Sequence, residues 1–147
     1  MKTTNKILEY QTKGELDFID ITKEVKDFIE RGPIKNGLVN LQTFHTTCAL
    51  LLNENEPLLL EDIKKNLRDT APKSVTYNHD NFEIRTVNMC DDECANGHAH
   101  CKAIYLPSNL TLNLIDGKLQ LGQWQAIFMV ELDRSRKRTI QIQIMGD

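Results

Sequence analysis

The sequence predicts an α+β fold in which an antiparallel β-sandwich-like core is flanked by two to three helices. Three observations support this prediction. Alternating apolar residues gather toward the C-terminus, two earlier segments have helical periodicity, and the helices and hairpins occur in separate runs along the chain. No linker or internal repeat divides the 147 residues, so we expect a single domain spanning residues 1–147.

The first half of the chain is predicted to contain three strands and two helices. Apolar runs predict strands at residues 6–12, 37–44 and 48–52. The first helix is expected to have Thr22 as its N-cap and to end at Gly32, because apolar residues recur every three or four positions between them. The second helix follows an acidic, proline-containing entry at residues 53–57 and ends before Ala71.

The C-terminal third is predicted to be an antiparallel meander. Alternating leucines before Asp116-Gly117 predict a strand and a tight hairpin, because this dipeptide is a strong turn signal. The returning strand is expected to run from Lys118 to Leu132 with a bulge or a close backbone approach at Gly122, and a final strand alternates over residues 139–144. The segment 91–105 suits a short helix slightly better than a strand.

Composition excludes several classes of protein. A net charge of -3 argues against a general nucleic-acid binder, and no apolar run has the length of a signal peptide or a membrane span. The four cysteines lack paired spacing, and a zinc set drawn from residues 90–101 would spread over roughly 16 Å of a helix, too far for one ion. We therefore expect a cytoplasmic protein without a nucleic-acid or membrane partner.

The four histidines lie in three short polar stretches, residues 45–47, 79–80 and 96–100. Imidazoles carry protons near neutral pH and bind transition metals. On a helix His98 and His100 would point about 200° apart, so only one would face a site, and His100 is preferred. We expect His45, His79 and His100 to converge in a surface cleft, with nitrogens of at least two within about 5 Å. Each could instead be an ordinary strand-end or loop histidine.

Glu131 is the most suggestive acidic residue, because it follows the apolar run 126–130 and would be partly buried. A carboxylate in that position is suited to general acid or base chemistry, or to orienting a histidine. Arg138 on the following strand is its natural partner. A structural ion pair between the two would account for both residues without chemistry.

Two further groups of residues suit a small-molecule site. Thr46 and Thr47 carry hydroxyls that could bind phosphate or orient an imidazole. Trp124 and Gln125 could form the floor of a heteroaromatic pocket, one by stacking and the other by amide hydrogen bonds. The alternative for the single tryptophan is a place in the core.

Taken in order, these stretches resemble the YjbQ family, also called uncharacterised protein family 0047. The motifs that carry the resemblance are His45-Thr46-Thr47, Asn53-Glu54-Asn55, Asp62, His79-Asp80, Asn96-Gly97-His98-Ala99-His100, Asp116-Gly117-Lys118-Leu119, Leu121-Gly122 with Trp124-Gln125, and Glu131 with Arg138. They extend from about Gly37 to Met145. Two departures stand out: Gln123 replaces a common threonine, and residues 133–136 replace a Gly-Pro-Arg turn, which puts a phosphate role for the arginines of that turn in doubt.

The resemblance implies a compact α+β domain that forms a homotrimer, with a polar site near the subunit contacts and a bound divalent metal ion. For some members it implies a secondary thiamine-phosphate synthase activity, which joins a pyrimidine pyrophosphate to a thiazole phosphate with loss of pyrophosphate. The ordinary enzyme for that reaction resembles a (β/α)8 barrel, typically about 250 residues long, so the activity here would be convergent. A histidine cluster suits zinc or another transition metal better than magnesium.

These considerations give a set of candidate site residues. The candidate catalytic residues are His45, His100 and Glu131. The candidate metal ligands are His45, His79 and His100. The candidate ligand-binding residues are Thr46, Thr47, Asn96, Lys102, Ser108, Trp124, Gln125 and Arg138.

Three hypotheses about function follow. In the first, the chain is a small trimeric, cytosolic enzyme of the YjbQ type that acts on a phosphorylated or heteroaromatic metabolite, with thiamine-phosphate synthesis as a candidate reaction. In the second, it is a non-catalytic metal- or metabolite-binding protein whose histidines serve affinity alone. In the third, the polar clusters only support the trimer.

Overall fold

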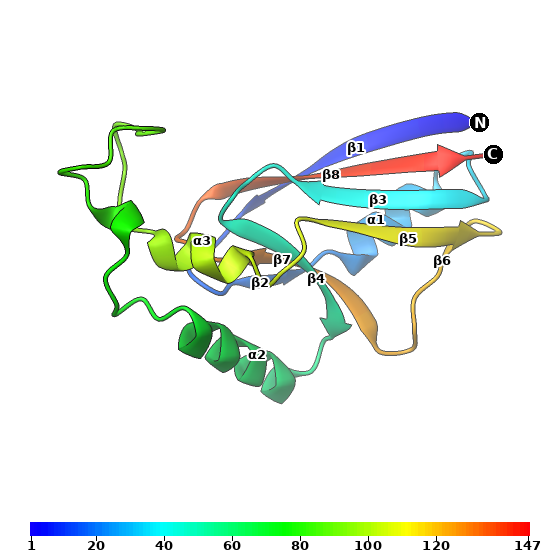
Figure 1. The fold of residues 1–147 in the computed structure, drawn as a ribbon. Helices are drawn as coiled ribbons and strands as arrows, with labels where there is room; N and C mark the ends of the chain where they lie inside the picture. The colour runs from blue at the N-terminus through cyan, green and yellow to red at the C-terminus, as the bar shows by residue number, and fades with distance from the viewer.

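Two antiparallel sheets face each other in the computed structural model, which describes residues 1–147 (Figure 1). The strands are β1 (Lys2–Gln11), β2 (Phe18–Asp20), β3 (Gly37–Thr43), β4 (Cys48–Glu54), β5 (Asn109–Ile115), β6 (Lys118–Leu119), β7 (Gln125–Glu131) and β8 (Lys137–Gly146). The larger sheet has the order β1-β8-β3-β5-β6, and the smaller has the order β2-β7-β4. The helices are α1 (Thr22–Glu30), α2 (Pro57–Thr70) and α3 (Gly97–Ala103), with a single 3-10 turn, η1 (Asn78–Asp80). The predicted α+β fold with a sandwich-like core and two to three helices is confirmed.

The core has two apolar layers that meet in β7. Ile127 and Met129 belong to the layer between the two sheets, whereas Phe128 and Val130 belong to the layer under α2 and α3. Because both faces of β7 are covered, its sequence is an unbroken apolar run. In β8, by contrast, Ile140 and its alternate neighbours are fully buried while the residues between them are only partly so, the pattern of a sheet with one covered face.

The two longer helices begin differently. The Glu56 carboxylate accepts hydrogen bonds from the amides of Leu58 and Leu59, at 2.9 and 2.8 Å, and Pro57 occupies the first turn of α2. The predicted N-cap role of Thr22 is wrong, because Ile21 holds the cap position of α1. The Thr22 hydroxyl instead accepts a 2.8 Å hydrogen bond from the Ile127 amide, which ties α1 to β7.

The predicted single strand from Lys118 to Leu132 is wrong. The hairpin at Asp116-Gly117 forms, but β6 ends after two residues and the chain crosses to the other sheet. The crossing is a turn in which the Gly122 amide donates to Oε1 of Gln125 at 2.8 Å, so Gly122 marks a sheet change and not a bulge. The expected meander is also wrong, because β8 pairs with β1 and β3 and not with β7.

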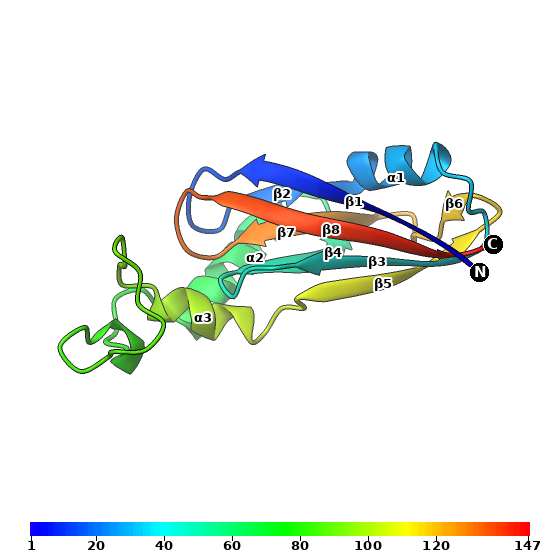
Figure 2. The same ribbon diagram turned by 90° about the horizontal axis from the view of Figure 1, so that it is seen from above.

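The segment between α2 and α3 projects beyond one end of the sandwich (Figures 1 and 2). It contains η1 and several turns, and among its side chains Ile84 and Val87 are strongly exposed. The expected short helix within residues 91–105 is present as α3. None of the helices combines the length and the apolar character that a membrane span requires.

Candidate functional site

The segment between α2 and α3 projects from one end of the sandwich (Figure 1). Residues of this end line a polar cleft of about 720 Å³. All but two of its lining side chains are polar or charged. They come from the β3–β4 loop, the segment from η1 onward, α3 and the β7–β8 turn: Thr46, Thr47, Asn78, His79, Arg85, Val87, Asn88, Cys90, Asp92, Glu93, Asn96, His100, Arg134 and Arg136. We call this hollow the histidine cleft.

Two of the candidate histidines meet in the histidine cleft. The rings of His79 on η1 and His100 on α3 are 4.5 Å apart between centroids and are inclined at 63°. The Nε2 atom of His79 is buried and has no hydrogen-bond partner. Burial, and the neighbouring His79, hold the pKa of His100 below its ordinary value. His100 is therefore favoured in its neutral form, which can accept a proton or bind a metal.

The contact between these rings depends on how closely η1 approaches α3. The Asp80 carboxylate accepts hydrogen bonds from the backbone amides of Asn96 and Gly97, at 2.9 and 2.8 Å. It thus provides an acceptor for N–H groups at the start of α3 that have no partner within the helix. A Cβ atom at position 97 would lie 2.5 Å from Cβ of Tyr77. Only glycine permits this approach, so Asp80 and Gly97 together position the histidine pair.

Three arginines, Arg85, Arg134 and Arg136, line the histidine cleft, and each of them is paired with a carboxylate. The buried Asp133 carboxylate accepts hydrogen bonds from Nη1 of Arg136 at 3.2 Å and from the side-chain Nδ2 of Asn96 at 3.3 Å. Sequence reasoning missed Arg85 and Asp133. The charged turn at residues 133–136 was a visible signal, but its departure from the family pattern had argued against it.

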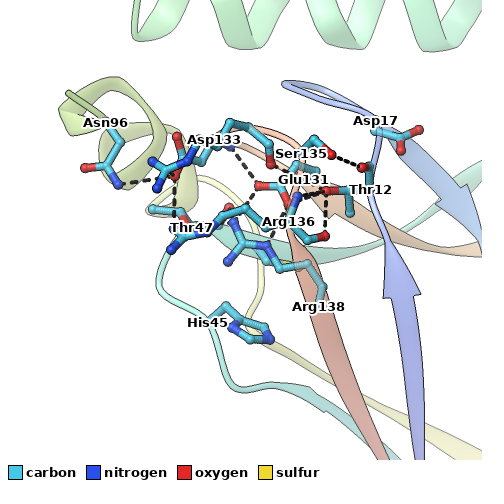
Figure 3. Close-up of polar contacts among 12 residues, drawn as sticks. Thr12, Asp17, His45, Thr47, Asn96, Glu131, Asp133, Ser135, Arg136 and Arg138 are labelled. Carbon is cyan, nitrogen blue, oxygen red and sulfur yellow. Dashed lines mark hydrogen bonds and ion pairs between the residues drawn. The ribbon is translucent and has the colours of Figure 1, made fainter. Parts of the chain in front are cut away.

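Glu131 and Arg138 form a buried ion pair beside the histidine cleft (Figure 3). Nε and Nη2 of Arg138 donate to the two carboxylate oxygens at 2.6 and 2.5 Å. The Thr12 hydroxyl and the Asp133 amide add bonds of 2.9 Å each to the same carboxylate. Arg138 also donates to the carbonyl and the hydroxyl of Thr47. The Glu131 carboxylate is thus fully occupied and does not line the cleft, an arrangement that matches the structural ion-pair interpretation.

His45 lies apart from the other two histidines. It lines a smaller hollow of about 330 Å³ with Phe44, Thr46, Thr47, Arg136, Lys137 and Arg138, which we call the small recess. The small recess shares Thr46, Thr47 and Arg136 with the histidine cleft. Burial, and then the charge of Arg138, lower the pKa of His45. Within one chain, the structure places His79 and His100 together and His45 in a neighbouring hollow.

Four candidate ligand-binding residues lie outside both hollows. Lys102 is fully buried, and its ammonium contacts the Ala71 carbonyl, Glu15 and His98 at 2.8, 3.0 and 3.1 Å. Ser108 is exposed between α3 and β5. Trp124, 66% exposed, and Gln125 lie in the turn that starts β7, about 20 Å along that strand from the end beside the cleft. Trp124 is therefore not a core residue.

The donor set in this chain is incomplete for a metal ion. His79 and His100 supply two imidazoles, and the unpartnered Nε2 of His79 suits a ligand atom. A protein zinc site has three or four ligands, however, and no group of three or more histidine, cysteine, aspartate or glutamate side chains is arranged to hold an ion. One chain alone therefore does not complete a metal site.

The fold and the site together define a small α+β sandwich protein with a polar, histidine- and arginine-lined cleft at one end. Residues 6–147 match the family described as UPF0047 protein YjbQ-like, and the chain belongs to that YjbQ family. It is 35% identical to a UPF0047 protein of Methanothermobacter thermautotrophicus over 99% of this chain and 94% of that protein. It is 29% identical to the UPF0047 protein YugU of Bacillus subtilis over 96% and 98% of the two chains.

Solved structures agree with this assignment. A YbjQ-like protein of unknown function from Sulfolobus solfataricus P2 superposes with a TM-score of 0.86 at 33% identity, covering 99% of both chains. A hypothetical protein from Aeropyrum pernix K1 superposes with a TM-score of 0.84 at 28% identity, covering 100% of both. Neither name states an activity.

Proposed function

We propose that this chain is a small, cytoplasmic, trimeric enzyme that binds a phosphorylated heteroaromatic metabolite in the histidine cleft. The observation that carries the proposal is the His79–His100 pair facing arginines and threonine hydroxyls in one hollow. The candidate reaction is thiamine-phosphate synthesis, in which the thiazole nitrogen bonds to the pyrimidine methylene carbon while the carbon–oxygen bond to pyrophosphate breaks.

The residues of the histidine cleft suit the demands of this reaction. Arg85, Arg134 and Arg136, each paired with a carboxylate, provide N–H donors for a departing pyrophosphate, and arginine binds phosphates through paired N–H groups. The threonine hydroxyls add hydrogen bonds. His100, whose lowered pKa favours the neutral form, keeps a nitrogen lone pair available for a metal ion.

The proposal includes a divalent transition-metal ion, zinc in preference to magnesium, at His79 and His100. Imidazole nitrogens favour zinc, whereas magnesium prefers oxygen ligands. Because the chain offers only the pair, the remaining ligands would come from the metabolite or a neighbouring subunit. Titration with zinc should raise the melting temperature of the wild type and not that of His79→Ala, since binding to the folded state stabilises it. An equal rise in both proteins would contradict this site.

The homotrimer is supported by the outer face of the larger sheet. In neighbouring strands Asn5, Gln143, Asn40 and Thr111 lie side by side, a row without charge across four strands. An uncharged sheet face of this kind suits contact with a second copy of the chain. All four cysteines are free, which agrees with a reducing, cytoplasmic location. Sedimentation of the purified protein would test the trimer; a monomer at micromolar concentration would contradict it.

The test of the activity is direct. The protein is incubated with pyrimidine pyrophosphate and thiazole phosphate, with and without zinc, and mass spectrometry follows the coupled product. His100→Ala should lower turnover by roughly 10-fold to 100-fold, because it removes one of the two imidazoles proposed to hold the metal ion. Cys101→Ala is the matched control, because Cys101 follows His100 on α3 but does not line the cleft. Absence of product with the wild type would remove this reaction from the proposal.

The second candidate function is a non-catalytic binder of a metal or metabolite. The polar lining of the histidine cleft is sufficient for it, because affinity needs fewer positioned groups than catalysis. In that case His100→Ala and His45→Ala abolish binding measured by calorimetry, and no product is found with any substrate pair. If the same variants change only the sedimentation coefficient, the polar clusters serve the trimer alone.

A further inference from the structure

The small recess differs from the histidine cleft in its chemistry. It is lined by Phe44, His45, Thr46, Thr47, Arg136, Lys137 and Arg138, and it contains no carboxylate. The histidine cleft, by contrast, includes Asp92 and Glu93. The recess therefore offers hydrogen-bond donors and positive charge to whatever enters it.

His45 is fixed as a hydrogen-bond donor toward this space. The backbone amide of Thr139 donates to Nε2 of His45 at 2.9 Å, and the Thr139 hydroxyl lies 3.1 Å from the same nitrogen. An amide N–H can only donate, so Nε2 must be unprotonated, and the neutral ring carries its hydrogen on Nδ1. Nδ1 has no partner in the protein and is not among the fully buried unpartnered atoms, so its N–H is accessible.

Arg138 supplies a second fixed donor. Its side chain is only 3% exposed, and the bonds of Nε and Nη2 to Glu131 and Thr47 hold the guanidinium rigidly. Nη1 has no partner within the protein, and it too is absent from the fully buried unpartnered atoms. Figure 3 shows the Arg138 side chain between Glu131 and His45, and both Arg138 and His45 line the recess. A nearly buried guanidinium thus keeps an open pair of N–H donors there.

We propose that the small recess is a phosphoryl-binding site in which Nδ1–H of His45 and Nη1 of Arg138 donate to the oxygens of the anion. Arg136 and Lys137 add positive charge at its rim, and the threonine hydroxyls complete the donors. His45 then serves as a neutral, positioned donor, because its Nε2 is already occupied by Thr139.

The inference rests on the proposed function only in taking the phosphoryl group to be that of the metabolite. The recess shares Thr46, Thr47 and Arg136 with the histidine cleft, so one molecule can place its phosphoryl group in the recess and its ring beside His100. Binding of free phosphate to the recess requires no activity in the cleft.

Two substitutions at one position separate the structural and the binding role of His45. In His45→Gln the side-chain oxygen reaches the position of Nε2 and still accepts from Thr139, but no donor remains at the position of Nδ1. In His45→Asn the side-chain nitrogen takes the position of Nδ1 and can donate. Inorganic phosphate is the probe, titrated by calorimetry at constant ionic strength. We expect about tenfold weaker binding to His45→Gln and less than threefold weakening for His45→Asn.

Equal affinity of the wild type and His45→Gln would overturn the proposal, as would equal loss in both variants. A measurement on the wild type needs no variant: nitrogen NMR should find His45 protonated on Nδ1 and not on Nε2, with the Nδ1–H signal shifting as phosphate is added. A proton on Nε2 would refute the assignment. Thiazole phosphate should compete with inorganic phosphate while the dephosphorylated alcohol should not, which identifies the phosphoryl group as the part bound.

Failure of this inference is distinguishable from failure of the proposed function. His100→Ala removes the imidazole of the histidine cleft but leaves every residue of the recess in place, so it should bind phosphate like the wild type while losing turnover. A wild type that binds phosphate through His45 and forms no product would support the recess and contradict the enzyme.

Discussion

Replacing Glu131 with glutamine should destabilise the protein strongly. The side chain keeps its shape, but its amide group turns two donor hydrogens toward groups that themselves donate, namely Arg138, the Thr12 hydroxyl and the Asp133 amide. Arg138, 3% exposed on its side chain, is left with a buried charge and no counter-ion. Breaking one partner of a buried ion pair typically costs about 3–5 kcal/mol.

The expected loss converts into a melting temperature through the size of the chain. An unfolding entropy of about 2.1 cal/mol/K per residue gives roughly 0.3 kcal/mol/K for 147 residues. The melting temperature of Glu131→Gln should therefore fall by about 10–16 °C. Calorimetry on both proteins measures the shift, and urea titration gives the free energy of unfolding independently.

A matched double variant controls for the loss of packing. Glu131→Leu combined with Arg138→Met removes both charges, and it should lose less stability than the two single changes added together. A fall of less than about 3 °C for Glu131→Gln would refute the reasoning. If that small fall came with loss of turnover, Glu131 would be a catalytic residue after all, and the ion-pair interpretation would be wrong.

Three further predictions concern the positioning of the site and its titration. Gly97→Ala should lower the free energy of unfolding by about 1–3 kcal/mol, because its methyl group would lie 2.5 Å from Cβ of Tyr77. The control Gly122→Ala should show little change in thermal unfolding, because its methyl group would lie 3.4 Å from the nearest atom, which belongs to a flexible side chain. The pKa values of His45, His98 and His100 are lowered in the folded protein, so the unfolded chain binds more protons at acidic pH. The free energy of unfolding should therefore have its full value above about pH 6.5 and fall as the pH drops below it. Urea midpoints at pH 8, 6.5 and 5 measure this change. A constant midpoint would contradict this. Arg136→Gln should weaken both phosphate binding and turnover, because Arg136 lines both hollows, and an effect on only one of them would separate the two sites.

The elements of the fold that the sequence predicts well are those encoded by neighbouring residues. Alternation identifies β5 and β8, the dipeptide Asp116-Gly117 identifies the hairpin, and Pro57 marks the start of α2. The change of sheet between β6 and β7 was missed, although a signal was present. Strict alternation before Asp116 indicates a strand with one buried face, whereas the unbroken apolar run from Ala126 indicates a strand with two buried faces. This difference indicates that the two strands belong to different sheets.

The pairing of β8 with β1 and β3 and the contact of His79 with His100 had no comparable local signal. The first joins strands from opposite ends of the chain. The second depends on a turn-rich segment between residues 81 and 95, whose path follows from tertiary contacts such as those of Asp80 with the amides of α3. A three-residue strand such as β2 is also too short for periodicity to reveal.

Residue type alone did not separate structural from available polar groups in this molecule. Glu131 and Lys102 were candidates because charged residues near apolar runs often carry chemistry, yet every oxygen of Glu131 and the ammonium of Lys102 are engaged within the protein. A buried polar network is stable only when its members are satisfied, so such groups have little capacity left for a ligand. Atoms with capacity left beside the two hollows include Nε2 of His79, Oδ1 of Asn96, Nδ1 of His45 and Nη1 of Arg138. Hydrogen bonds to neighbouring residues hold the side chains of Asn96, His45 and Arg138 in place. Unsatisfied hydrogen-bonding capacity on a fixed side chain is therefore the stronger guide to a candidate ligand site in this protein.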